Sequence, residues 1–337
     1  MNKVRFAIIG CGGIADRRAI PGMLLSDGIE IVAVMDKSAE AARAVAENRG
    51  FAHWFDDAEE MLRTVPCDAV YIATPVFCHY EQVMLALRYG CHVLVEKPLA
   101  LNKTQGQAML DAFKAAGKQL SVGYMMSRHS LHNKMRDIVA DGGIGKLNLA
   151  RLQFFCWYPD IPGAWRQKKA LGGGGCIADL AVHCLELFTS VTGEQIADYK
   201  AFLDTMTFHY EVEDSAVITF KTDKGTLGHI DVNFNIPDGC APTRFELFGT
   251  EGSLIAENTL SQLERGTLRY VHVDRKGYDA QQNGTLAPPE EFVGEDGDMY
   301  QKQFDAFCAI LNSDRCDYSG AEQAQRIQAL CDEIYGI

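Results

Sequence analysis

The stretch Val4-Arg-Phe-Ala-Ile-Ile-Gly-Cys-Gly-Gly-Ile-Ala15 decides the fold. Residues 4–9 are apolar and β-prone apart from Arg5, as expected for a buried parallel strand. Gly10 permits a tight turn after this strand, Gly12 lets the backbone approach a pyrophosphate, and Ala15 is small enough for a helix to lie close to the strand. The stretch therefore predicts the first strand, turn and helix of a dinucleotide-binding fold.

The turn and the end of the next strand supply the expected cofactor contacts. N–H groups at the helix start face the phosphates in such folds, and the residues of this cradle are Gly10, Cys11, Gly12, Gly13 and Ile14. A second strand over 30–35 is followed by Asp36, whose carboxylate can accept hydrogen bonds from the adenosine ribose and repel a 2′-phosphate. Asp36 also fits a plain turn after the strand, and the cation of Lys37 would offset a 2′-phosphate. We expect NAD, with NADP as the alternative.

Residues 1–125 alternate between strand-like and helix-like segments. Strands are expected at 4–9, 30–35, 69–73, 92–96 and 119–124. Helices are expected at 14–25, 38–49, 57–64, 79–89 and 103–116, with Ser38 and Asn102 as N-caps. This alternation implies an α/β fold with a parallel, doubly wound Rossmann sheet.

The pattern changes after residue 125. Further helices are expected at 130–141, 176–190, 298–312 and 319–335, and strands at 147–157, 197–208, 214–222, 226–235 and 242–248. The segment 275–297 is rich in Gly, Asp, Glu and Pro and predicts a long surface loop. Consecutive strands with short turns imply an antiparallel sheet. We expect a Rossmann domain over 1–125 and an α/β domain with a large open, mainly antiparallel sheet over 126–337, the final helix being able to return to the first domain.

Composition limits the function further. A formal net charge of −13 argues against nucleic acid or an anionic membrane as a partner. No apolar run approaches the length of a membrane span, and the chain enters a strand at once without a signal peptide. Its 11 cysteines are odd in number and scattered, and they form no Cys-x-x-Cys pair. We therefore expect a cytoplasmic protein with reduced cysteines and no metal site.

Four motifs in order identify a family resemblance. They are the cradle, Ala73-Thr74-Pro75 followed by His79, Glu96-Lys97-Pro98, and the run from Gly172 through Asp179 to His183. With these motifs the chain resembles, essentially end to end, the Gfo/Idh/MocA family of glucose–fructose oxidoreductases and inositol dehydrogenases. The resemblance implies a Rossmann domain followed by an α/β domain, and a cis peptide between Lys97 and Pro98. It also implies association through the open sheet, so we expect a homodimer or homotetramer formed through residues 197–250.

Lys97 is the first catalytic candidate. Residues 92–95 form a buried-strand pattern, so Lys97 emerges at the carboxyl edge, where doubly wound sheets bind ligands. An ammonium there can bind a substrate hydroxyl and favour alkoxide-like character at its oxygen. The residues alone fit equally a strand-end lysine that points to solvent, and it is the resemblance that implies a catalytic role.

Asp179 and His183 are the second catalytic group. Their spacing of four places them on one face if 176–190 is helical, with Glu186 nearby. Imidazole is the usual proton carrier near neutral pH. Such pairs are common on ordinary helices. The resemblance implies that His183 is the general acid/base, that Asp179 binds substrate, and that Glu186 replaces the aspartate often found there and lies behind the site.

The remaining candidates contact cofactor or substrate by resemblance. The cofactor set comprises Thr74, Pro75, His79, Glu96 and Lys97, although His79 also fits a helix start that faces water. The substrate set comprises Arg128, Trp165, Arg166, Asp179 and His183, because aromatic faces stack on sugar rings and guanidinium groups clamp polar substituents.

Together these observations predict an NAD(P)-dependent oxidoreductase. We expect it to act on a secondary alcohol or ketone of a sugar, cyclitol or sugar derivative. Two alternatives stay open: a redox-neutral enzyme that oxidises a sugar transiently with tightly bound NAD, and a non-catalytic dinucleotide-binding regulator. Retention of both Lys97 and His183 counts against the regulator.

Overall fold

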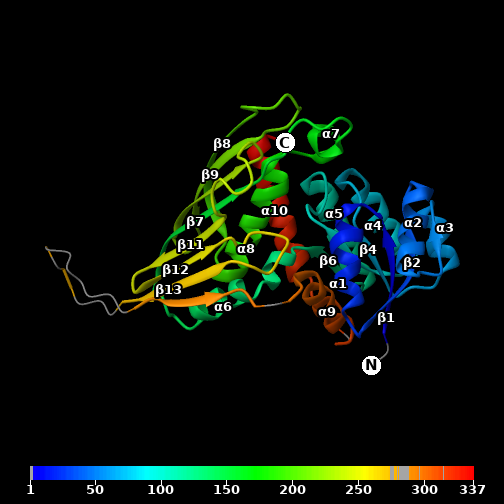
Figure 1. Cartoon of the computed structure of the whole chain (residues 1–337), viewed down its shortest axis with the longest axis horizontal. Helices are drawn as coiled ribbons and strands as arrows, with labels where there is room; N and C mark the ends of the chain where they lie inside the picture. The colour runs from blue at the N-terminus through cyan, green and yellow to red at the C-terminus, as the bar shows by residue number, and fades with distance from the viewer. Residues whose placement is uncertain (1–2, 274–276, 279, 281–287, 296, 314) are drawn as a thin grey trace. The chain divides into compact units, whose positions relative to one another are not determined.

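The chain forms two compact units. The computed structural model describes residues 3–273, 277–278, 280, 288–295, 297–313 and 315–337 (Figure 1). The first unit combines Met1–Met125, Ala164–Gly173 and Tyr300–Ile337, and the second combines Met126–Gly163 and Gly174–Met299. Three separate segments of sequence therefore build the first unit.

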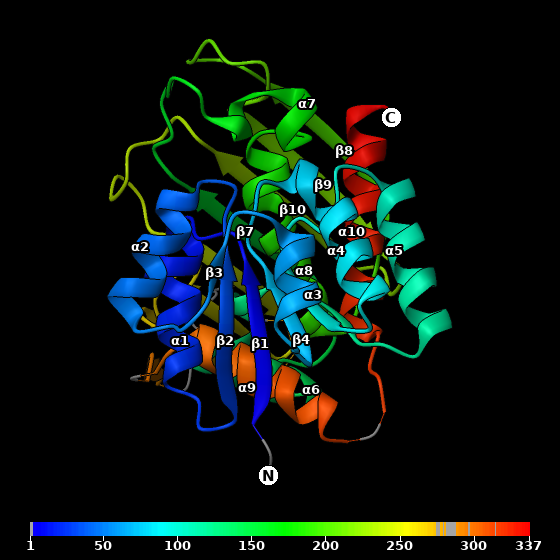
Figure 2. The same cartoon turned by 90° about the vertical axis from the view of Figure 1, so that its right-hand side faces the viewer.

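A six-stranded sheet forms the centre of the first unit. Its order is β3-β2-β1-β4-β5-β6, and all of its pairs are parallel. The strands are β1 (Val4–Ile9), β2 (Ile29–Met35), β3 (Trp54–Phe55), β4 (Ala69–Ile72), β5 (His92–Glu96) and β6 (Leu120–Gly123). Figure 2 shows β1 and β2 side by side between helices. The predicted doubly wound sheet is confirmed. The prediction omits β3, because two residues are too few to show a period.

The helices predicted for this unit lie close to helices of the structure, whereas the short helices over 76–78, 165–167 and 169–172 are not predicted. The helices of this unit are η1 (Ala15–Ala19), α1 (Ile20–Leu24), α2 (Ala39–Arg49), α3 (Ala58–Thr64), η2 (Val76–Cys78), α4 (His79–Arg88), α5 (Lys103–Ala116), η4 (Trp165–Gln167), α7 (Lys169–Gly172), α9 (Met299–Leu311) and α10 (Ser319–Tyr335). Ser38 and Asn102 accept hydrogen bonds from Ala41 N and Gln105 N, which confirms both N-caps. The first helix begins with a π-helical turn, η1, that its sequence pattern does not reveal.

The last two helices complete the core of the first unit. Phe304 and Phe307 of α9 lie with their ring centroids 5.8 and 5.7 Å from that of Phe6 on β1. On α10, the Asp332 carboxylate accepts a hydrogen bond from Lys103 N, at the start of α5. Residues about 300 positions later in the chain therefore pack against this sheet.

The second unit contains an eight-stranded sheet of order β14-β13-β12-β11-β7-β10-β9-β8. Its strands are β7 (Leu147–Phe155), β8 (Ile196–Asp204), β9 (Ser215–Thr222), β10 (Leu227–Asn233), β11 (Arg244–Gly249), β12 (Gly252–Glu257), β13 (Thr267–His272) and β14 (Glu290–Val293). Only β7 and β10 pair in parallel among these described strands, so the predicted mainly antiparallel sheet is confirmed. Figure 1 shows α6 (Ser130–Ala140) and α8 (Val182–Thr192) along one face of this sheet.

Some predictions for this unit are wrong. The strands β12 and β13 are not predicted, and the residues of β14, a short strand with two exposed glutamates at the edge of the sheet, are predicted to form a loop. Charged edge strands lack the apolar alternation on which the prediction depends. The rest of the predicted 275–297 loop lies mostly outside the described residues.

Within the described residues, the segment Lys169–Thr192, from the start of α7 to the end of α8, is long and apolar enough to cross a membrane by length and composition alone. This differs from the expectation that no apolar run approaches the length of a membrane span. The most apolar window of this segment is 78% buried within the structure, as expected for a helix of a protein core.

Candidate active site

The glycine turn of the first unit leaves room for a ligand. Gly10 has φ +100°, and a Cβ there would come within 2.8 Å of the Ala73 carbonyl, so this position requires glycine. Gly12 is exposed, and a Cβ there would meet no atom within 4 Å. The turn therefore packs closely on β4 on one side and is open on the other, as a pyrophosphate cradle requires.

Asp36 is fixed beside this turn. Its Oδ2 accepts a hydrogen bond of 2.8 Å from Cys11 N, and its Oδ1 accepts one of 2.9 Å from Ser38 N. Each oxygen retains acceptor capacity for a ribose hydroxyl. The carboxylate therefore holds the turn after β2 and the turn at Cys11 together, whereas Lys37 is exposed.

His79 lies inside the first unit rather than at its surface. Its side chain is buried, with Nδ1 3.0 Å from the Pro98 carbonyl oxygen and Nε2 3.0 Å from the Thr74 carbonyl oxygen. The alternative of a helix-start histidine facing water is therefore wrong. Because burial lowers the pKa of His79, the neutral ring is favoured, and it donates to one carbonyl at a time. His79 thus connects the loop after β4 to the segment after β5.

Lys97 follows β5 at the carboxyl edge of the sheet and is half-buried. The Lys97–Pro98 peptide is cis, as the resemblance implied. Glu96 accepts a hydrogen bond of 2.7 Å from the buried Tyr71 hydroxyl, and the same carboxylate lies against Gly123 of β6. Glu96 is therefore held by neighbouring strands, next to the lysine.

Trp165 and Arg166 belong to the first unit, in η4. The Arg166 guanidinium carbon lies 4.7 Å from the centre of the Trp165 ring, a cation–π arrangement. Behind them, a Cβ on Gly172 would lie 2.8 Å from the Arg166 carbonyl oxygen. Glycine at this position lets the chain fold back closely on itself.

Asp179 and His183 lie at the start of the long helix of the second unit. The predicted helix is confirmed over 177–192, and it begins with a π-helical turn, η5 (Ile177–Ala181), before α8. Asp179 is half-buried, and His183 is buried with its ring centroid 6.4 Å from that of Phe154 on β7. π-Helical turns are rare and occur often at functional sites.

Glu213, which the sequence analysis missed, holds the start of this helix. Its buried carboxylate accepts a hydrogen bond of 2.9 Å from Ile177 N, and both of its oxygens lie 3.0 Å from Gly175 N. A Cβ on Gly175 would collide with the Glu213 backbone carbonyl. A charged acceptor thus stabilises the helix terminus that carries Asp179.

Glu186 lies behind His183, one turn further along α8. Burial raises the pKa of the Glu186 carboxyl to about 8, although the charge of Arg128 and a hydrogen bond with Ser127 oppose the shift. Its Oε2 is buried and makes no hydrogen bond. Glu186 is therefore protonated over most of the physiological range, unlike an ordinary surface glutamate.

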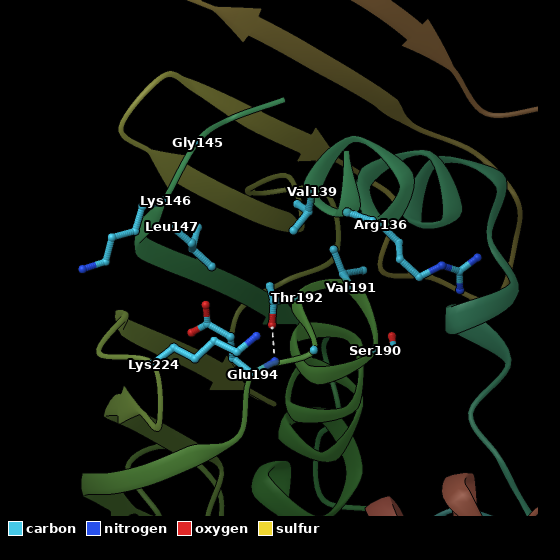
Figure 3. Close-up of a pocket in the computed structure, with 12 residues that line it drawn as sticks. Arg136, Val139, Gly145, Lys146, Leu147, Ser190, Val191, Thr192, Glu194 and Lys224 are labelled. Carbon is cyan, nitrogen blue, oxygen red and sulfur yellow. Dashed lines mark hydrogen bonds between the residues drawn. The ribbon is translucent and has the colours of Figure 1, made fainter. Parts of the chain in front are cut away.

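One cavity in the second unit lies away from these motifs. It has a volume of about 680 Å³ and lies at the carboxyl end of α8, with Val139, Leu147 and Val191 on its wall. Figure 3 shows Arg136 and Lys146 extending away from its centre. This hollow does not include Asp179 or His183, and we assign no ligand to it.

The chain is similar to known oxidoreductases. Residues 4–124 match an oxidoreductase family with an NAD-binding Rossmann fold, and residues 132–255 match the GFO/IDH/MocA C-terminal domain. A 1,5-anhydro-D-fructose reductase of Ensifer adhaerens is 33% identical over 265 residues, which are 78% of this chain and 79% of the reductase. A dTDP-3,4-didehydro-2,6-dideoxy-alpha-D-glucose 3-reductase of Streptomyces violaceoruber is 31% identical over 262 residues, 77% of this chain and 75% of its own.

A solved structure shows the same fold. The aldose-aldose oxidoreductase from Caulobacter crescentus, complexed with glycerol, superposes with a TM-score of 0.86 at 23% identity, covering 99% of this chain and 97% of its own. The four motifs of the sequence analysis all fall inside the two matched segments. The chain therefore belongs to the GFO/IDH/MocA oxidoreductase family, with an NAD-binding Rossmann fold.

Proposed function

We propose that the protein is an NAD(H)-dependent oxidoreductase of a secondary alcohol or ketone in a sugar, cyclitol or sugar derivative. The observation that carries the proposal is Lys97, which follows β5 at the sheet edge where the Gly10–Ile14 turn also lies. His183 on α8 supplies a second proton-active group, and the named activities of the relatives support the substrate class.

The first unit has the residues to hold the cofactor. Its phosphates would lie against the N–H groups of the open turn at Gly12, and its adenosine ribose against Asp36. A carboxylate in that place opposes a 2′-phosphate, so NAD is favoured over NADP. When bound, the nicotinamide supplies the hydride acceptor or donor.

Proton movement is the task of the side chains. In the oxidation direction, His183 takes the proton of the substrate hydroxyl, and the Lys97 ammonium stabilises the negative charge that develops on its oxygen. Asp179 binds a neighbouring hydroxyl and orients the substrate. Trp165, Arg166 and Arg128 are the proposed contacts for the rest of the sugar.

Screening tests the activity directly. A set of sugars and cyclitols with NAD should show NADH formation by absorbance for at least one of them. With that substrate, Lys97→Ala and His183→Ala should each lower turnover by about 10²–10⁴-fold. The matched controls are Lys168→Ala and His209→Ala, which replace exposed side chains of the same types and should leave turnover nearly unchanged.

Two results would count against the proposal. Near-normal turnover in both active-site variants would remove Lys97 and His183 from the mechanism. Tight NAD binding without turnover of any alcohol would favour the redox-neutral enzyme or the regulator, neither of which has support from the relatives.

We further propose a cytoplasmic homodimer or homotetramer formed through the exposed face of the eight-stranded sheet. Phe202 on β8 is 80% exposed, its register partner Val217 is 42% exposed, and Leu227 on β10 is 55% exposed. An exposed apolar surface of this kind is typical of an interaction site. Light scattering should give a multiple of 37.2 kDa.

Introducing a charge tests this face. Phe202→Glu should shift the mass toward the monomer, whereas Leu25→Glu, at a 59% exposed leucine of the first unit, should not. A wild-type mass near that of one chain would refute the assembly.

A further inference from the structure

Two cysteines lie in contact at the amino end of the Rossmann sheet. Cys67 precedes β4, Cys91 precedes β5, and their Sγ atoms are 3.5 Å apart. Cys67 is half-buried and Cys91 is buried. We propose that Cys67 and Cys91 are a dithiol that peroxide converts reversibly into a disulfide bond.

The backbone already holds the pair in place. β4 and β5 pair in parallel with Ala69 opposite His92, and His92 N donates a hydrogen bond of 3.0 Å to the Asp68 carbonyl oxygen. Neighbouring strands are about 4.8 Å apart, and disulfides join Cα atoms about 4.4–6.8 Å apart. Continuing this register places Asp68 beside Cys91, so Cys67 is a diagonal neighbour of Cys91, and the sulfurs have to close from 3.5 Å to about 2 Å for a bond to form.

The surroundings also favour reaction. A hydrogen bond from the Cys67 thiol and the nearby Lys118 ammonium lower the pKa of the Cys91 thiol. The opposite holds for Cys67: its hydrogen bond to Cys91 and its burial raise the pKa of the Cys67 thiol, so this thiol keeps its proton. A lowered pKa increases the fraction of Cys91 that is thiolate, which is the form that attacks peroxide.

The chemistry balances with hydrogen peroxide as the oxidant. One thiolate attacks a peroxide oxygen and becomes a sulfenic acid, and the departing hydroxide takes up a proton as water. The second sulfur then displaces the sulfenic hydroxyl, which leaves as a second water. Two thiols are oxidised by two electrons, one peroxide is reduced, and an added dithiol reverses the change.

The expected consequence is stability rather than loss of activity. The disulfide would join two residues that are 24 positions apart in the sequence. This link would reduce the conformational entropy of the unfolded chain and so stabilise the folded protein. Its site is the amino end of β4 and β5, whereas Thr74 and Lys97 follow the carboxyl ends of the same strands. We expect the midpoint of thermal unfolding to rise by about 3–5 °C on oxidation, with NAD binding unchanged.

Peptide mapping after mild peroxide treatment of the whole protein tests the proposal. Trypsin leaves Cys67 and Cys78 in one peptide, residues 64–88, and Cys91 in another, residues 89–103, since it does not cleave before Pro98. A cross-linked pair of these peptides, 2 mass units lighter than their sum and separated by dithiothreitol, is expected. Cys78→Ser is the matched control, because it changes the other cysteine of the same peptide.

The variants decide the outcome. Cys78→Ser should keep both the cross-link and the rise in the unfolding midpoint, and Cys67→Ser should lose both. Peptides that are linked elsewhere, no 67–91 link after peroxide, or an unchanged midpoint rise in Cys67→Ser would each overturn the proposal. These readouts do not depend on turnover, so they stand apart from the proposed activity.

Discussion

Replacing Glu213 by alanine should weaken both the stability and the activity of the protein. The substitution removes the carboxylate that accepts from Gly175 N and Ile177 N at 2.9–3.0 Å. A buried N–H without a partner costs about 1–3 kcal/mol. Two such groups give about 2–6 kcal/mol, and because water can enter the space left by the side chain, we expect about 2–4 kcal/mol.

The substitution should also lower the rate of catalysis, because this helix carries two of the proposed catalytic residues. Its first turn contains Asp179, and His183 follows one turn later. Fraying of this turn would misplace both groups, and small misplacements of catalytic groups cost as much as 10²-fold. We therefore expect turnover to fall by about 10–100-fold in Glu213→Ala. Glu213→Gln keeps one oxygen acceptor and should show an intermediate loss.

Urea unfolding, monitored by tryptophan fluorescence, measures the change in the free energy of unfolding. Turnover of a substrate found by screening measures the change in catalytic rate. Glu251→Ala is the control, because it removes an exposed glutamate of the same unit. A stability loss below about 0.5 kcal/mol in Glu213→Ala, the range of ordinary surface substitutions, would refute the reasoning that Glu213 holds the helix start.

Three further predictions concern single side chains. His79→Ala should lower turnover by about 10-fold or more, because it disconnects the Pro98 and Thr74 carbonyls; steady-state kinetics would contradict this if kcat were unchanged. The pKa of Glu186 is raised from 4.5 to about 8, so the folded protein retains a proton that the unfolded chain releases, and wild-type stability should fall as pH rises between these values. Glu186→Gln should remove about 2–4 kcal/mol of that fall. If the urea midpoint changed by the same amount between pH 5 and pH 8 in the wild type and in Glu186→Gln, the prediction would be wrong. Asp36→Ala should reduce the preference for NAD over NADP by about 1–3 kcal/mol, as measured by titration of both cofactors; unchanged relative affinities would show that Asp36 does not select the cofactor.

The parts of the fold that the sequence predicts are those with a strong local period. β1, β2 and the cradle glycines follow from apolar runs and turn residues that only one local structure accommodates. The sequence does not reveal β14 or the π-helical turn before α8. An edge strand is held by its neighbour, and a π turn arises from packing around the helix rather than from the residues within it.

The same distinction applies to the candidate site: some of its residues belong to local sequence motifs, and others are revealed only by contacts made in the folded chain. Lys97 and His183 are predicted from the family resemblance, which can be seen in the sequence because each of their motifs is a short continuous stretch. Glu213 is 36 positions from the amide of Ile177 that it holds, and nothing near it in the sequence marks that contact. His79 is recognisable in its motif, but its two backbone partners become visible only after folding.

The order of synthesis leaves the amino-terminal sheet incomplete for most of translation. Phe6 leaves the ribosome early, whereas its aromatic partners Phe304 and Phe307 belong to α9. At about 5–20 residues per second, roughly 15–60 s pass between them. During this time Phe6 on β1 lacks these two aromatic partners. Chaperones that bind exposed apolar residues on the ribosome would therefore influence the yield of this protein more than that of one whose Rossmann unit is continuous in sequence.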